Sequence, residues 1–223
     1  MTDKTICYIC GQALVGKINK DHVPMKQLYG KEYRRITNPN LFCLPTHQKC
    51  NKSFQKDEEY FVYTFIPIAR ETPAGKYVAE DVKDRARSGE QRPLLHLVLK
   101  QFAESIKGAS ADMRMIKIDG SRVWRVIWKI AKGLYYKEKQ GYLSDDVPKY
   151  LSLYGPDDRI PDTLKDALTS LESRADYPPV FDYRYRQFPE VHNAHLFLMT
   201  LWDTYLFEVV FHDPDCLCEA CVL

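Results

Sequence analysis

Four residues near the N-terminus have the types and spacing of a metal site. Cys7 and Cys10 are separated by two residues, and so are His47 and Cys50. Because each pair is closely spaced, its two side chains can bind the same ion, and thiolate and imidazole ligands in a tetrahedron suit Zn²⁺. Four protein ligands leave no open position on zinc, so we predict a structural ion, with four residues that bind no metal as the alternative.

A second set of residues could hydrolyse a phosphodiester, a reaction that needs a base to activate water and a cation to neutralise the phosphate. His22 titrates near neutral pH and is the natural base, and Asp21 offers a hard oxygen for Mg²⁺ or Mn²⁺. Neighbouring side chains of a strand point to opposite faces, so both could reach one phosphate only where the chain bends, as Pro24 allows. The simpler interpretation makes Asp21 the cap of a turn and His22 a surface histidine.

Four spaced motifs together resemble the HNH endonuclease family. They are CYIC at residues 7–10, DH at 21–22, NL at 40–41 and HQKCN at 47–51. The resemblance implies a ββα-metal fold, in which a hairpin and a helix surround a metal. It also makes His22 the general base, Asp21 and Asn51 the ligands of a catalytic Mg²⁺ or Mn²⁺, and Asn40 the residue that holds the His22 loop by hydrogen bonds.

The chain departs from the family's common pattern at two positions. Asn51 stands where many members have histidine, and an amide oxygen in place of a ring nitrogen favours Mg²⁺ or Mn²⁺ over a softer metal. His47 stands where members often have cysteine. This second change conserves zinc ligation, but it leaves an alternative in which Cys43 is the zinc ligand and His47 belongs to the nuclease site.

The segment KCNKSFQKDEEYFVYTFI, residues 49–66, predicts the helix that closes the nuclease unit. Lys52 and Lys56 are four residues apart on this helix, so both could contact backbone phosphate, although a solvated lysine pair is equally expected. This segment and KGLYYKEKQGYL at residues 132–143 are also similar to a bacterial subgroup of HNH proteins without an assigned biological role.

We predict an α+β fold in which a small zinc-stapled ββα unit precedes a helical and antiparallel-β domain. The nuclease domain is expected at residues 1–68. Proline, glycine and dense charge at residues 69–92 indicate a linker with one short helix, and residues 93–223 form the C-terminal domain, whose role the sequence leaves open.

Apolar periodicity predicts the elements of this second domain. Helices are expected at residues 93–108 and after Asp119-Gly120, with a short strand at 113–119 and a short helix at 161–173. Three strands within residues 181–212 would form an antiparallel meander against the two helices. Arg184 and Arg186 share one face of the first of these strands, where they could track a phosphate backbone, although a solvated face is the more common role.

The C-terminal tail holds a second group of metal-binding residue types. They are His212, Cys216, Cys218 and Cys221. These residues could form a second zinc site of the Cys₃His type, although Cys-x-Cys leaves little room for a regular knuckle. The alternatives are a tail with free thiols and a redox role.

Charge and composition limit the classes of function. The net charge is +2, but residues 1–60 contain ten Lys and Arg against six Asp and Glu, so basic character concentrates around the expected phosphate site. The odd number of seven cysteines, in metal-like spacings, differs from a disulfide framework. With no signal peptide and no apolar run of about 20 residues, we expect a cytoplasmic protein without a membrane partner.

These features together predict a metal-dependent HNH endonuclease with structural Zn²⁺ and catalytic Mg²⁺ or Mn²⁺. Double-stranded DNA is the favoured substrate by family analogy, with weak sequence preference and a role such as restriction or antiviral defence. The alternative is a zinc-stabilised module that binds nucleic acid or protein without catalysis. A third interpretation is a nuclease held inactive until a regulatory protein partner releases it.

Overall fold

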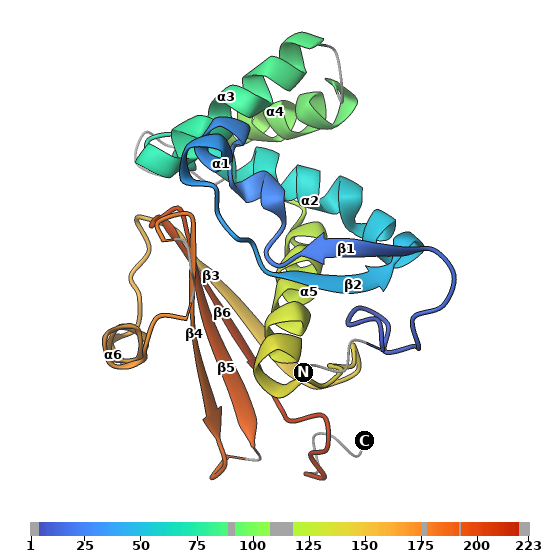
Figure 1. Cartoon of the computed structure of the whole chain (residues 1–223). Helices are drawn as coiled ribbons and strands as arrows, with labels where there is room; N and C mark the ends of the chain where they lie inside the picture. The colour runs from blue at the N-terminus through green and yellow to red at the C-terminus, as the bar shows by residue number, and fades with distance from the viewer. Residues whose placement is uncertain (1–4, 89–91, 108–117, 175–177, 192, 219–223) are drawn as a thin grey trace.

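The computed structural model describes residues 5–88, 92–107, 118–174, 178–191 and 193–218. Its N-terminal part contains an antiparallel pair of strands, β1 (Ile18–His22) and β2 (Cys43–His47), in which Asp21 lies opposite Leu44 and His22 opposite Cys43. The connection between them contains a short 3-10 helix at Lys26–Leu28 and helix α1 (Lys31–Thr37). Helix α2 (Gln48–Ala69) begins directly after β2 and covers the helix predicted at residues 49–66 (Figure 1).

Two helices between the N-terminal part and the final sheet differ in how well the sequence predicted them. Helix α4 (Arg92–Lys107) was expected. In contrast, α3 (Pro73–Ser88) is a helix of 16 residues in the segment assigned to a linker with one short helix. The dense charge that suggested a linker lies mostly on the exposed side of α3, whereas Ala74 and Val78 are buried. The linker interpretation therefore missed an amphipathic helix.

Helix α5 (Gly120–Lys139) is the central element of the fold. Asp119 caps it, accepting a hydrogen bond from the backbone N–H of Arg122 at 3.4 Å, which confirms the predicted helix start after Asp119-Gly120. Helix α5 contacts both α2 and the four-stranded sheet. Gly133 lets it approach the end of β1, because a Cβ atom there would lie 2.6 Å from the side chain of Val23.

The C-terminal part is a four-stranded antiparallel sheet in the order β3-β6-β5-β4. Strands β4 (Phe181–Phe188), β5 (Ala194–Leu201) and β6 (Tyr205–Phe211) form the predicted meander. The fourth strand, β3 (Lys149–Tyr154), was not predicted, and it pairs with β6 at the sheet edge. The predicted short helix is α6 (Asp162–Ser170). Most of the strand expected at residues 113–119 lies outside the described residues, and its last two residues are not in a strand.

Alternate residues of the sheet face two different layers. Phe197 and Phe211 lie on the face toward α5, where Trp128 and Tyr135 pack against Phe211. The opposite face packs against α6 through a small cluster around Leu164. Because both faces are covered, β5 is buried along nearly its whole length. The mixed α+β class is therefore confirmed, with a helical layer on each side of the sheet (Figure 1).

The apolar core is continuous across the boundary that we expected near residue 69. Two hydrogen bonds join the sheet to the N-terminal part. The Trp202 indole donates to the Leu28 carbonyl at 3.1 Å, and the Tyr205 hydroxyl donates to the Phe65 carbonyl at 3.2 Å. The N-terminal elements are therefore held by the C-terminal sheet. Within the described part of the chain, no helix is long and apolar enough to span a bilayer.

Candidate metal centre and basic pocket

The four predicted zinc ligands converge in the structure. The ligand atoms of Cys7, Cys10, His47 and Cys50 all lie within 4.8 Å of one another. His47 Nδ1 is 3.4 Å from the Cys10 sulfur and 3.9 Å from the Cys50 sulfur. Sulfur and nitrogen ligands of one tetrahedral zinc ion are separated by about 3.6 Å, given typical Zn–S and Zn–N bond lengths. The cluster could therefore hold a zinc ion.

Local structure explains why these side chains meet. Cys7 and Cys10 flank a tight turn, closed by a hydrogen bond from the Gly11 N–H to the Cys7 carbonyl at 2.8 Å, and Gly11 has a φ of 73°. His47 ends β2, and Cys50 lies in the first turn of α2. The strand-to-helix junction therefore supplies one pair of ligands, and the N-terminal turn supplies the other.

The pKa values of Cys7 and Cys50 are shifted in opposite directions. Burial raises the pKa of the Cys7 thiol, but hydrogen bonds from Thr46 and from nearby backbone groups bring it down to about 6. Burial, together with the neighbouring Cys10 and Cys7 sulfurs, raises the pKa of Cys50 to about 12. Several thiolates at this separation repel one another, and a bound divalent cation removes that repulsion.

The tautomer of His47 also fits metal binding through Nδ1. The shorter contact of its other nitrogen, Nε2, is with the Ala13 carbonyl at 3.0 Å. The Val15 N–H also points at Nε2, at 3.4 Å, but the shorter contact is with a carbonyl oxygen, which only accepts, and it favours a proton on Nε2 and a lone pair on Nδ1. Cys43 donates instead to the Leu41 carbonyl at 3.3 Å and is not part of the described cluster. The alternative with Cys43 as the zinc ligand is therefore not supported.

Asp21, the expected ligand of a catalytic metal, lies in a buried ion-pair network. Its Oδ2 atom accepts from the Tyr8 hydroxyl at 2.5 Å and lies 2.7 Å from Lys129 Nζ. The same ammonium group binds Glu58, so a lysine of α5 joins carboxylates from β1 and α2. All four residues are buried.

This arrangement does not fit the metal role expected for Asp21. A divalent cation on its Oδ2 atom would have to displace or approach the Lys129 ammonium, because that oxygen already accepts from two donors. The partner ligand Asn51 lies in the first turn of α2 and is half-buried. We therefore assign no chemical step to a metal bound by Asp21 and Asn51.

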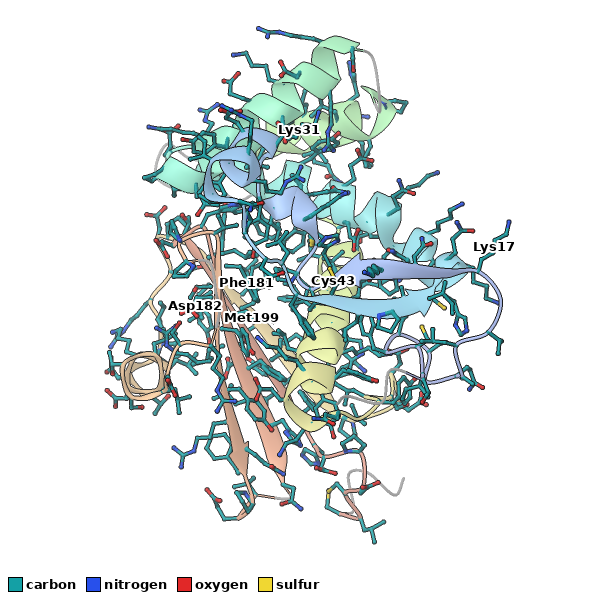
Figure 2. The ribbon with its side chains drawn as sticks, in the orientation of Figure 1. Lys17, Lys31, Cys43, Phe181, Asp182 and Met199 are labelled. Carbon is teal, nitrogen blue, oxygen red and sulfur yellow. The ribbon has the colours of Figure 1, made fainter. Side chains whose placement is uncertain are left out.

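The connection between β1 and β2 forms a basic pocket of about 500 Å³, which we call the His22 pocket. Lys31 at the start of α1 and Cys43 at the start of β2 are labelled in Figure 2 and mark this part of the molecule. The residues that line the pocket are His22, Lys26, Lys31, Arg34, Arg35, Asn38, Pro39, Asn40 and Leu41. Four of them are cationic, and no carboxylate is among these described lining residues. The pocket therefore has the charge of an anion site.

The chain path explains how His22 and Asn40 come together. Helix α1 ends at Asn38, whose φ of 43° is left-handed and whose N–H donates to the Arg34 carbonyl at 2.9 Å. This turn sends the chain back toward β2, so Asn40 lines the same pocket as His22. Of the four residues expected in the nuclease site, the pocket lining contains His22 and Asn40 but neither Asp21 nor Asn51.

The surroundings of His22 favour its neutral form. Burial lowers the pKa of this imidazole, and the positive charges of Lys26, Arg34 and Lys129 lower it further, while Asp21 opposes them. His22 also borders a narrow gap that it shares with Glu58 and Lys129. It therefore lies between the basic pocket and the buried network, with a ring that can accept a proton at neutral pH.

The residues expected to contact nucleic acid lie elsewhere. Lys52 and Lys56 are exposed on α2, and Arg186 is exposed on β4. Arg184 pairs with the buried carboxylate of Asp182 at 2.7 Å, so its charge is already partly neutralised. None of these four residues lines the described His22 pocket.

The four pocket cations and Lys129, the partner of Asp21, were not predicted from the sequence. A local signal for three of the cations exists in KEYRR at residues 31–35, where basic residues recur on a short helix. Lys129 gave no such signal, because in the sequence it looks like one more polar residue of an amphipathic helix.

In the tail, His212, Cys216 and Cys218 form a second cluster, and Cys221 lies outside the described residues.

Comparison with known proteins leaves the site to be interpreted from its own geometry. No protein-family model, curated protein or solved structure matches this chain. The structure contributes two independent observations. A Cys₃His cluster could hold zinc beside the β1–β2 pair, and the connection between these strands forms a basic pocket lined by His22 and Asn40.

Proposed function

We propose that this protein is an HNH-type endonuclease that hydrolyses phosphodiester bonds of nucleic acid, with DNA favoured, in the His22 pocket. The observation that carries the proposal is the lining of this pocket. A histidine that is neutral at pH 7 and an asparagine share it with four cationic side chains. Phosphate is the group on nucleic acid that such a lining binds best, because Lys and Arg neutralise its charge.

The chain's own residues have distinct roles in this proposal. Lys26 and Lys31 bind the backbone phosphates, whereas Arg35 shares its charge with Glu32, which it contacts at 2.5 Å. His22 accepts the proton of the attacking water, and Asn40 orients the groups around it by hydrogen bonds. The zinc cluster fixes the junction of β2 and α2. It thereby also fixes β2, the strand that follows Asn40 in the chain.

A divalent metal would stabilise charge on the phosphate and on the leaving oxygen. Dependence on Mg²⁺ or Mn²⁺ is therefore part of the proposal. We assign no residue as a ligand of this metal, because Asp21 is bound to Lys129. The second candidate function, binding of nucleic acid without cleavage, is favoured by this same ion pair. It would use the His22 pocket as an anion site alone.

His22→Ala is expected to reduce cleavage of supercoiled plasmid by about 10²- to 10⁴-fold, the usual contribution of a general base. The assay is run with Mg²⁺, with Mn²⁺ and with a chelator, and zinc content is measured in parallel. His96→Ala is the matched control, because His96 is exposed on α4 and should leave the rate unchanged. An inactive wild type that still binds DNA would support the binding function, and equal rates in wild type and His22→Ala would contradict the proposed site.

Lys26→Ala is expected to weaken duplex DNA binding and to flatten its dependence on salt. Losing one phosphate contact reduces the slope of log K against log salt concentration by about 0.9. Fluorescence anisotropy over a series of salt concentrations measures this slope. Lys165→Ala on α6, an exposed lysine that is not in the pocket lining, should keep the wild-type slope. Identical slopes for the two variants would exclude the His22 pocket as the phosphate site.

A further inference from the structure

The chain that follows β6 carries a second convergent group of ligand atoms. His212 Nδ1 is 3.3 Å from the Cys218 sulfur and 3.8 Å from the Cys216 sulfur. The three ligand atoms lie within 4.8 Å of one another. The corresponding nitrogen-to-sulfur distances in the first cluster are 3.4 and 3.9 Å. The two clusters therefore share one geometry, close to the separation of about 3.6 Å expected around zinc.

Hydrogen bonding between thiols and imidazole does not account for this arrangement. A neutral imidazole has one lone pair on one ring nitrogen, so Nδ1 can accept well from only one thiol. Here two sulfurs converge on the same nitrogen. A cation at the centre would bind all three atoms at once, and soft sulfur donors with one nitrogen select zinc among the common divalent ions.

The backbone around the cluster is held by several hydrogen bonds. The His212 N–H donates to the Pro148 carbonyl at 3.2 Å, which continues the pairing beside β3. The Cys216 N–H donates to the Asp213 carbonyl at 2.9 Å, closing the turn that brings Cys216 toward His212. The ligands are therefore presented by a folded segment.

The same segment is attached to the core of the sheet. The Asp213 carboxylate lies 3.1 Å from Nε2 of His195, a residue of β5 with no exposed surface. The other nitrogen of His195 lies 2.9 Å from the Tyr185 hydroxyl on β4. A metal bound beside Asp213 would thus stabilise the segment after β6 against the end of the sheet.

We propose that His212, Cys216 and Cys218 bind a second zinc ion, which fixes the C-terminal segment to the sheet; these three are its ligands among the described residues. The site shares no residue with the His22 pocket or with the first cluster. It is therefore independent of the proposed nuclease activity, and its test does not depend on cleavage.

The test is the zinc content of purified full-length protein, equilibrated with Zn²⁺ and then passed through a desalting column. We expect two equivalents in the wild type, one in the Cys216→Ser/Cys218→Ser variant, and two in Cys43→Ser, the control cysteine outside both clusters. One equivalent in the wild type, or two in the double variant, would overturn the proposal. His212→Ala is a second, less disruptive variant, and it should also retain one equivalent.

Cobalt substitution gives an independent spectroscopic test of the ligands. Co²⁺ bound by thiolates absorbs in a sulfur-to-metal charge-transfer band, whose intensity grows with the number of Co–S bonds. The wild type has five sulfur ligands in the two clusters, and the double variant would keep the three of the first. A band about 40 percent weaker in the double variant supports the second site, given three instead of five such ligands. Equal bands in the two proteins contradict it.

Discussion

Cys7→Ser/Cys10→Ser is expected to cause the largest loss of stability of any change considered for this chain. Structural zinc contributes an apparent free energy of about 10–16 kcal/mol in small zinc modules, whereas whole domains are stable by about 5–15 kcal/mol. Cys7 has no exposed surface, and it belongs to the same apolar core as the helices and the sheet. Loss of the ion should therefore unfold the N-terminal turn and loosen the core that it joins.

The contact between this turn and α5 makes the effect extend beyond the first residues. Lys132 of α5 donates from its buried ammonium to the Ile9 carbonyl at 2.6 Å, within the same turn. Without the zinc cluster, that lysine would lose a partner in the interior. We therefore expect one shared unfolding transition that moves to lower temperature, rather than a local loss confined to the N-terminus.

Thermal unfolding followed by circular dichroism, with zinc content measured on the same samples, tests this expectation. The double variant should lose one equivalent of zinc and melt at least 15 °C lower or fail to fold, since about 1 kcal/mol shifts the midpoint of a chain this size by about 2–4 °C. Cys43→Ser controls for the loss of a thiol and should keep both its zinc and its midpoint. A double variant with full stability would show that no structural ion is bound there.

Lys129→Met is expected to destabilise the protein by about 3–5 kcal/mol, because it leaves two buried carboxylates without their cation. Methionine keeps much of the length and volume of the lysine stem, so the change removes charge more than packing. Lys129 is 3 % exposed and binds both Asp21 and Glu58. Urea unfolding of wild type and variant at pH 7 measures the difference.

Lys83→Met is the matched control for this substitution. Lys83 pairs with Glu80 on the surface of α3 at 3.2 Å, with both side chains more than half exposed. Such pairs contribute about 0–1 kcal/mol, so the control should lie close to the wild type. Similar stability losses in Lys83→Met and Lys129→Met would show that the buried network has no special role.

The pH dependence gives a second signature of the Lys129 network. Burial raises the pKa of Glu58 above its usual 4.5, although Lys129 opposes this rise. In the Lys129→Met variant that opposition is gone, so the folded state binds a proton more readily than the unfolded state. The free energy of unfolding of the variant should then increase as the pH falls through the folded-state pKa of Glu58 toward 4.5. Below pH 4.5, Glu58 is protonated in both states and makes no further change to the free energy of unfolding. A loss of stability that is constant from pH 8 to pH 5 would contradict this explanation.

The network also bears on how the proposed nuclease would work. Asp21 was expected to bind a metal, and the structure pairs it with a lysine from another part of the chain. His22 and Asn40, in contrast, line the same basic pocket. The proposed catalytic function therefore rests on the pocket, and the metal requirement is decided by the cleavage assay.

The amino-acid sequence by itself determined the elements whose signals are local. The two pairs of predicted zinc ligands have spacings of two residues, and a turn and a strand-to-helix junction convert such spacing directly into convergent side chains. The caps and periodicity around Asp119 and Pro93 located two helices, and alternation in FDYRYRQF located β4. Each of these signals depends on neighbours within a few residues, so it can be detected in the sequence without knowledge of the tertiary structure.

Only the tertiary structure decided which distant residues share a site. The KYLSLY strand carries weak alternation of its own and is a strand because the edge of β6 offers its backbone groups partners. Lys129 reaches Asp21 and Glu58 because α5 packs against both α2 and the end of β1. The four pocket cations line one pocket with His22 because the connection between β1 and β2, with Lys26 in its 3-10 helix and the other three on α1, folds back toward β2. Long-range packing brings these charges together, and periodicity along the chain contains no information about such partners.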